Sequence, residues 1–301
     1  FDFFVANVVS SLDSLGVSTS LHTLGIFLPV GISFYTFQTM SYTLDIHRGK
    51  LEPRRNFLDY VVFVSFFPQL VAGPVERAAT LLPQMEKTRT LTTEKFQSGL
   101  GLALWGAFKE VVIADSVAPY VDKIFILTEP SAPLIWIGAV GFAIQILADF
   151  SGYTDIARGI ARMLGIELME NFKNPYLAAT PSEFWRRWHV SFSTWIRDYL
   201  YIPAGGSRGG FLSMTRATFI AMLLSGLWHG ASWNFVIWGA FHALLLTGYR
   251  VVTPRIPTWL AELPGSRAAA VAIMFTFTCV GWLIFRETHI DRLMAYMTLN
   301  P

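Results

Sequence analysis

The chain has 301 residues, of which 53% are hydrophobic and only 15% are charged, and its formal net charge is +2. In globular domains about a quarter of the residues are charged. Because the apolar residues here also fall in long blocks, the composition excludes a soluble globular protein. A nearly neutral chain gives no indication of a nucleic-acid partner. Cys279 is the sole cysteine, which excludes an internal disulfide and a cysteine-based metal cluster.

We expect one all-α polytopic membrane domain that covers residues 1–301. The chain starts at Phe1 without a Met, and no basic segment or small-residue cleavage site precedes the first apolar residues. It stops at Pro301, soon after a charged run. These features predict no signal peptide and a domain that is truncated at both ends.

Several apolar blocks have the length needed to cross a hydrocarbon core of about 30 Å. The expected spans are Leu24–Leu44, Ser98–Ala118, Leu134–Phe150 and Ala268–Phe285, with Phe1–Leu15 as the remnant of another. The low-charge stretch Pro119–Pro133 predicts an external loop, and the basic stretch Ser151–Arg216 then lies in the cytoplasm.

The block Phe57–Val75 does not fit a simple crossing. Pro68 and the Gly73-Pro74 pair interrupt it and leave only a short helix. Basic residues flank it on both sides, so both flanks are expected in the cytoplasm. The pattern predicts a re-entrant segment, which is tolerated only where it is buried in protein or lines a wet cavity.

The block Ala217–Tyr249 is too long for one crossing and short for two. Gly226 and Gly230 bracket His229 near its middle. We expect two helices that meet deep in the membrane at a break around Gly230–Asn234.

The stretch SEFWRRWHVSFSTWIRDYL at Ser182–Leu200 combines three Trp, three Arg and a His. On one helix, its side chains would form two faces. The expected apolar face holds Trp185, Trp188, Phe192, Trp195 and Tyr199, and the expected polar face holds Ser182, Arg186, His189, Ser193 and Arg197. Each charge costs about 2.5–3.5 kcal/mol among lipid tails. The helix is therefore expected at the membrane interface, as an anchor, or against a water-filled cavity.

His229 is the sharpest functional candidate, because no formal charge accompanies it between Ala217 and Tyr249. An ionisable residue inside a membrane is a functional hypothesis by default. The structural alternative is a neutral His that donates one hydrogen bond to a helix carbonyl. Asn234 is expected to hold one imidazole nitrogen. For His242, packing between helices is an equally good explanation.

Four motifs, taken together and in this order, resemble the membrane-bound O-acyltransferase (MBOAT) family, in particular its bacterial branch that acts in alginate O-acetylation. They are FFPQLVAGPVER at Phe66–Arg77, DFSGYTDIARGIARMLGI at Asp149–Ile166, ENFKNPYLAATPSEFWRRWHVSFSTWIRDYLYIPAGG at Glu170–Gly206 and SGLWHGASWNFVIWGAFHALLL at Ser225–Leu246. The resemblance implies a multi-helix fold with re-entrant segments around a central tunnel. It also implies acyl transfer from a cytoplasmic thioester to a hydroxyl, with His229 at the family's catalytic position and His189 at that of its second histidine.

This chemistry needs a base for the hydroxyl proton and stabilisation of an oxyanion. An imidazole with a pKa near about 6.5 can act as the base, and we assign that role to His229. His189 would position the acceptor, shuttle the proton or donate to the oxyanion. Substrate-binding candidates are Asn234, Arg186, Arg187, Arg197, Ser193 and Trp228. The arginines would bind phosphates of a coenzyme A-type donor or, equally, lipid headgroups.

The sequence predicts no bound cofactor and no metal. The expected donor substrate is an acyl-CoA, and the resemblance implies acetyl-CoA. Ser225, four residues before His229, is the one hydroxyl that suggests a covalent step. By the resemblance, the acceptor is a glycan or an intermediate on the way to an extracytoplasmic polysaccharide. The protein would lie in a bacterial inner membrane among lipids, with a periplasmic acyltransferase as a possible partner. A transporter or channel and a scaffold are the alternatives.

Overall fold

The computed structural model describes residues 31–70, 73–127, 130–230, 232–257, 259 and 262–298, together with positions 5, 9, 12, 16 and 17. These described residues form helices and no strand. In chain order the helices are α2 (Ile32–His47), α3 (Phe57–Val64), η1 (Phe67–Gln69), α4 (Ala78–Glu86), α5 (Thr93–Ala107), η2 (Phe108–Ala114), α6 (Asp115–Ile126), α7 (Ala132–Met163), η3 (Pro175–Leu177), α8 (Pro181–Arg187), α9 (Val190–Ile196), η4 (Arg197–Tyr201), α10 (Gly210–His229), α11 (Trp233–Val252), η5 (Thr253–Arg255), α13 (Ser266–Arg286) and α14 (Ile290–Thr298).

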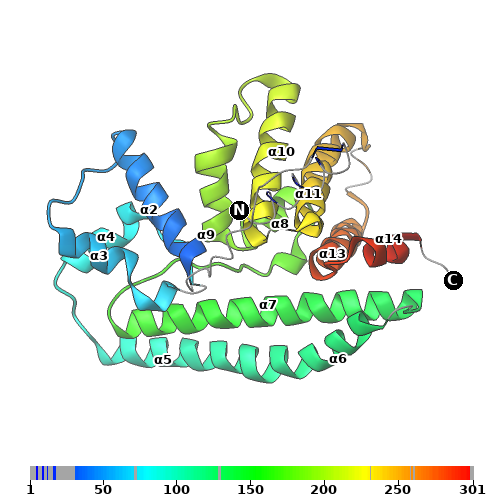
Figure 1. The fold of residues 1–301 in the computed structure, drawn as a ribbon. Helices are drawn as coiled ribbons and strands as arrows, with labels where there is room; N and C mark the ends of the chain where they lie inside the picture. The colour runs from blue at the N-terminus through cyan, green and yellow to red at the C-terminus, as the bar shows by residue number, and fades with distance from the viewer. Residues whose placement is uncertain are drawn as a thin grey trace.

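The longest helix, α7, forms a platform with α5, η2 and α6, which run antiparallel beside it (Figure 1). The two layers approach closely because glycines face each other across them. A Cβ on Gly99 would lie 2.7 Å from the carbonyl oxygen of Gly159, and one on Gly159 would lie 2.5 Å from that of Gly99. Small residues at such positions let helix backbones pack closely within a membrane.

The turn of π-helix at η2 widens the first layer where a charged side chain enters the platform. Lys109 Nζ lies 2.6 Å from the carboxylate of Asp155 and donates to Ser151 Oγ at 3.0 Å. Asp155 also accepts from Arg158 at 2.9 Å. A charge between two apolar helices costs several kcal/mol unless it is paired, and this cluster supplies the pairs.

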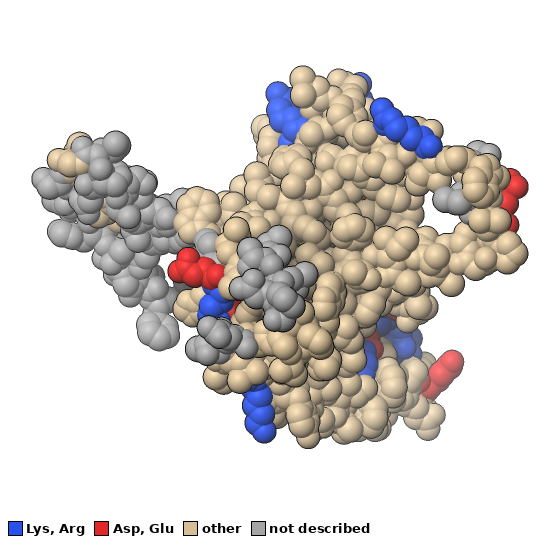
Figure 2. All heavy atoms as spheres, turned by 90° about the vertical axis from the view of Figure 1, so that its right-hand side faces the viewer, with Lys and Arg blue, Asp and Glu red and all other residues tan. Residues whose placement is uncertain are grey.

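Four of the described helices are long and apolar enough to cross a membrane: Ala132–Met163, Gly210–His229, Trp233–Arg255 and Ser266–Arg286. The first and last contain the expected spans Leu134–Phe150 and Ala268–Phe285, which are thus helices of sufficient length and apolarity. That they cross the membrane stays a prediction. On the face of the molecule that Figure 2 shows, charged side chains are sparse across the middle and lie mostly toward its outline.

The block Ala217–Tyr249 is short for two crossings, but its two helices extend beyond it at both ends. Helix α10 starts at Gly210 and α11 continues to Val252, so each has 20 residues. The glycines again decide the packing, because a Cβ on Gly226 would clash with the carbonyl oxygen of Phe235. The predicted break is confirmed, since α10 ends at His229 and α11 begins at Trp233.

Other sequence predictions have mixed outcomes. Ser98–Ala118 lies within α5, η2 and α6, of which the longest has 15 residues, so it is not one regular span. Leu24–Leu44 lies partly, and Phe1–Leu15 mostly, outside the described residues. The stretch Pro119–Pro133 is mainly helical rather than a loop, because α6 continues to Ile126 with Pro119 in its first turns. Its external position stays a prediction.

The interrupted block at Phe57–Val75 is short, as predicted. Helix α3 has 8 residues and ends at Val64, and Pro68 lies in the single turn η1. The whole apolar helical stretch, Phe57–Gln69, is too short to cross. That it enters and leaves the membrane on one side stays a prediction.

Candidate functional site

The stretch Ser182–Leu200 is not one helix. It starts as predicted, with Pro181 in the first turn and the Thr180 hydroxyl accepting from Glu183 N at 3.1 Å. Helix α8 then ends at Arg187, and α9 begins at Val190. Between them His189 adopts a left-handed conformation, with φ 42° and ψ 56°, which is uncommon for a residue other than glycine. The expectation of one straight helix with two faces is therefore wrong.

The break also decides the position of the His189 side chain. On a single helix this side chain is expected on the polar face with Arg186 and Arg197, at the membrane interface or against a water-filled cavity, but it is only 2% exposed. Its ring lies 4.7 Å from Phe150 and 5.0 Å from Phe192, measured between centroids. Its Nε2 atom is buried without a hydrogen-bond partner among the described residues. Burial, with a smaller contribution from His229, holds the pKa of His189 well below its usual value, so the imidazole is neutral.

His229 is the last residue of α10 and lies in the same aromatic cluster. Its ring centroid is 4.7 Å from that of Trp228, 5.0 Å from Phe285 and 5.1 Å from Trp238. Trp228 in turn lies 6.2 Å from the ring of His189. Unlike His189, the residue His229 keeps partial exposure. Two histidines that are 40 positions apart in sequence are thus brought to one wall of aromatic side chains.

His242 is packed between helices, which agrees with the structural explanation of this residue. It is 2% exposed, and its ring lies 4.7 Å from Trp238 and 5.1 Å from Trp185. Gly281 in α13 leaves the room for it, since a Cβ there would lie 3.1 Å from His242 Nε2.

The expectation that Asn234 holds the imidazole of His229 is wrong for the described residues. Its amide donates instead to the carbonyl oxygens of Ile284, at 3.3 Å, and Phe285, at 3.0 Å. Asn234 therefore ties the start of α11 to the end of α13 beside His229. Its Oδ1 atom is buried with no partner in the part of the chain that the structure describes.

A cavity of about 540 Å³ opens between α8 and α9 on one side and α10 and α11 on the other. Most of its wall is apolar, and its polar lining residues are Ser182, Arg186, Ser193, Thr194, Arg197, Tyr201, Thr218, Ser225 and Arg250. Phe192 also lines it and stacks at 4.3 Å on Trp228. The cavity thus adjoins the aromatic wall that carries both histidines.

The structure separates the candidate arginines into two groups. Arg186 and Arg197 line the cavity, and Arg197 is 2.7 Å from Asp198 in an ion pair. Arg187 does not line it, because it pairs with Glu183 at 2.6 Å. Sequence reasoning missed Arg250, which lines the cavity and has a buried Nη1 without a partner among the described residues. Its signal was weak, because a basic residue at the end of an apolar block is usually a flank.

Of the remaining candidates, Ser193 lines the cavity but donates to the carbonyl oxygen of Trp188 at 2.9 Å. The Ser225 hydroxyl is buried, lines the cavity and has no partner within the described ranges. In those ranges no three His, Cys, Asp or Glu side chains come together in a way that could hold a metal ion.

An all-α fold with four helices that are long and apolar enough to cross a membrane defines a membrane protein, and a histidine pair lies beside its arginine-lined cavity. The sequence profile described as "MBOAT, membrane-bound O-acyltransferase family" matches residues 53–288. The chain belongs to this family.

Its curated relatives include three kinds of transferase. It is 43% identical to the probable alginate O-acetylase AlgI of Azotobacter vinelandii, over 96% of this chain and 57% of the relative. It is 34% identical to the peptidoglycan O-acetyltransferase of Helicobacter pylori, over 96% of this chain and 59% of the relative. It is 27% identical to the teichoic acid D-alanyltransferase of Bacillus subtilis, over 88% and 69%. The chain therefore spans little more than half the length of the first two.

Proposed function

We propose that the protein is a membrane O-acyltransferase that moves an acyl group, acetyl in the first instance, from a thioester donor to a hydroxyl of an extracytoplasmic polysaccharide or of an intermediate on the way to it. Family membership supports the reaction class. The names of the relatives support acetyl as the group and a cell-surface polymer as the acceptor. A bacterial inner membrane is the location that fits such a donor and acceptor.

The observation that carries the proposal is the position of His229. Of the three histidines in the aromatic cluster, His189 and His242 are each 2% exposed, whereas His229 keeps partial exposure at the end of α10. A general base must reach the proton that it abstracts. His229 takes the proton of the acceptor hydroxyl while the hydroxyl oxygen attacks the thioester carbonyl. The C–S bond then breaks, and the proton passes from His229 to the leaving thiolate.

His189 would assist as a neutral imidazole. Its low pKa keeps it uncharged, and its unpartnered Nε2 can accept or, as the other tautomer, donate one hydrogen bond. A hydrogen bond from this atom to the acceptor would orient the hydroxyl, and one to the carbonyl oxygen would stabilise the oxyanion.

The cavity is the proposed donor site. Its apolar wall suits the pantetheine chain of acetyl-CoA, and the guanidinium groups of Arg186, Arg197 and Arg250 suit phosphate. Arg250 is the best of the three, because its buried Nη1 has no partner within the described residues. Arg187 does not line the cavity and is paired with Glu183, so we assign it a structural role. Trp228 and Asn234 would line the acceptor side with their buried, unpartnered polar atoms.

The test is thiol release from acetyl-CoA by the purified protein in lipid nanodiscs, with alginate or peptidoglycan fragments as acceptor. The expected result is release that depends on the acceptor, with acetyl groups recovered on the polymer. An intact acetyl-CoA pool with every acceptor would overturn the proposal. Uptake of acetyl-CoA into protein-bearing vesicles without thiol release would instead indicate a transporter, and a requirement for a second periplasmic protein would place this chain in a relay.

A further inference from the structure

Helix α9 begins in an unusual way. The first N–H groups of a helix have no partner within the helix and are usually capped by the side chain of the preceding residue, most often Ser, Thr, Asp or Asn. Here the preceding residue is His189, whose side chain makes no capping hydrogen bond. Its left-handed backbone turns the imidazole into the aromatic cluster instead. The cap must therefore come from elsewhere.

Asn171 supplies it from a distant segment. Its carbonyl oxygen accepts from Val190 N at 3.0 Å, and its side-chain Oδ1 accepts from Ser191 N at 3.1 Å. One residue thus caps the first two N–H groups of α9, immediately after His189. Asn171 is only 1% exposed, so water does not compete for these bonds.

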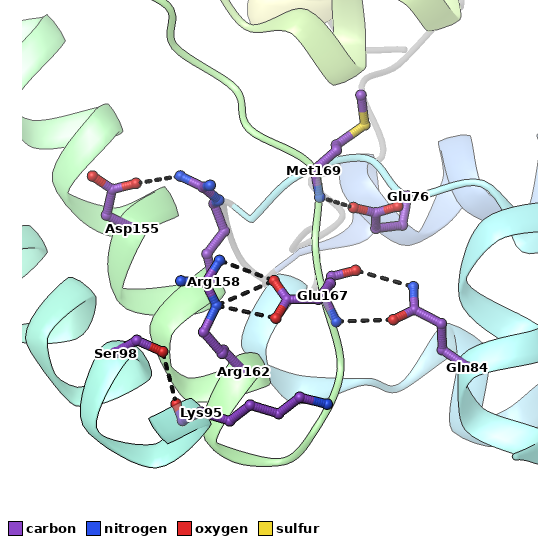
Figure 3. A network of polar contacts seen from close by, with 9 residues as sticks. All are labelled: Glu76, Gln84, Lys95, Ser98, Asp155, Arg158, Arg162, Glu167 and Met169. Atoms are coloured by element: carbon purple, nitrogen blue, oxygen red, sulfur yellow. Dashed lines mark hydrogen bonds and ion pairs between the residues drawn. The ribbon is translucent and has the colours of Figure 1, made fainter. Parts of the chain in front are cut away.

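The segment that carries Asn171 is itself fixed at two further points. Glu76, also 1% exposed, accepts from Met169 N at 2.6 Å (Figure 3). Gln84 binds the backbone of Glu167 through both ends of its amide, at 2.9 and 3.0 Å (Figure 3). A further bond makes these contacts a closed network, because the Ser191 hydroxyl accepts from Val75 N, next to Glu76, at 2.9 Å.

We infer that Asn171 is a positioning residue for His189. Because Asn171 caps α9 from another segment, the His189 side chain is not needed as the cap and can point into the site. Glu76 and Ser191 hold this cap in place. The inference rests on the proposed function for its kinetic consequence, although the geometric claim is independent of it. A left-handed histidine is strained and persists only where its surroundings fix it, and these bonds fix it on its C-terminal side.

Two variants of nearly equal size separate the roles of Asn171. Asn171→Asp keeps an oxygen acceptor at Oδ1, and the helix N-terminus offsets part of the cost of burying its negative charge. Asn171→Leu removes the acceptor. We expect Asn171→Leu to lower kcat by about 10- to 100-fold, as a small misplacement of a reacting group does, with the KM for acetyl-CoA unchanged. Asn171→Asp should retain kcat. Val121→Ala, a buried change in α6, is the control for destabilisation and should also retain it.

A readout without catalysis separates this inference from the proposed function. In ¹⁵N-histidine-labelled protein in nanodiscs, the His189 ring signal is identified by its loss in His189→Ala. The chemical shift of this signal should change in Asn171→Leu and should be unchanged in Asn171→Asp and Val121→Ala. If the wild type transfers no acyl group, the proposed function fails, but the ring signal still decides the inference.

If Asn171→Leu does not fold, Ser191→Ala removes the hydrogen bond to Val75 from the same network and should shift the His189 signal in the same way. An unmoved His189 signal in the folded variant would overturn the inference. So would a loss of kcat in Asn171→Asp that equals the loss in Asn171→Leu.

Discussion

Gly106 in α5 and Gly152 in α7 face each other where the backbones of the two helices are almost in contact. A Cβ on Gly106 would lie 2.5 Å from the carbonyl oxygen of Gly152, and one on Gly152 would lie 2.8 Å from that of Gly106. The pair repeats the contact between Gly99 and Gly159 seven residues away along each helix. The platform that carries the site is therefore built on two glycine contacts, with the charged pair of Lys109 and Asp155 beside them.

Gly106→Ala should destabilise the protein by about 1–3 kcal/mol, as overpacking of a close contact does. The carbonyl oxygen is backbone and cannot move away without separating the helices. Gly101→Ala is the matched control, because nothing lies within 4 Å of a Cβ there, and alanine favours a helix over glycine by about 1 kcal/mol. Thermal unfolding in detergent compares them. Equal stability of the two variants would contradict the packing.

His189 offers a test of its backbone. Both His189→Gly and His189→Ala lose the same ring contacts, but only glycine adopts φ 42° without strain. The glycine variant should therefore be more stable by about 1 kcal/mol. At Ser98, an exposed position inside α5, the order should be the opposite. A His189→Ala variant as stable as His189→Gly would show that the residue is not left-handed.

Glu76 predicts a pH dependence of stability. Burial raises the pKa of this carboxyl to about 7 from 4.5, against the opposing effects of the Met169 N–H and Arg77. The folded protein thus binds a proton that the unfolded chain has released, so stability falls as pH rises from 4.5 to 7 and is level above it. The fall is at most about 3 kcal/mol. Glu76→Gln keeps the acceptor and should remove this slope, whereas Glu262→Gln, at an exposed position, should retain it. A slope that survives in Glu76→Gln would contradict the assignment.

The sequence was sufficient for those features that depend on runs of residues. Blocks such as Ala268–Phe285 are long and uniformly apolar, so they predict α13 directly. The break after His229 was visible because glycines flank it. The same holds for the start of α8, where Thr180 and Pro181 are a local signal.

The features that the sequence missed depend on contacts between distant segments. Periodicity over Ser182–Leu200 favoured one helix, because nothing local marks a left-handed histidine. The break is stabilised by Asn171, some twenty residues earlier, and no spacing rule points to it. Likewise, the sequence indicates only a flanking charge at Arg250, because its place in the cavity depends on the packing of α11 against α10. Asn234 lies near His229 in sequence but donates its hydrogen bonds to α13.

The most direct test of the account is acyl transfer by His229→Ala. Removal of a general base typically costs about 10²-fold or more in rate, and a residue that is already partly exposed should be removable without loss of the fold. His229→Gln should not restore activity, because an amide cannot take the proton. His289→Ala, in an exposed loop, is the matched control, and His242→Ala should act mainly on stability. We predict a folded His229→Ala protein with thiol release from acetyl-CoA at least about 100-fold below wild type. Near-normal release by that folded variant would contradict the account and would transfer the role of the base to His189.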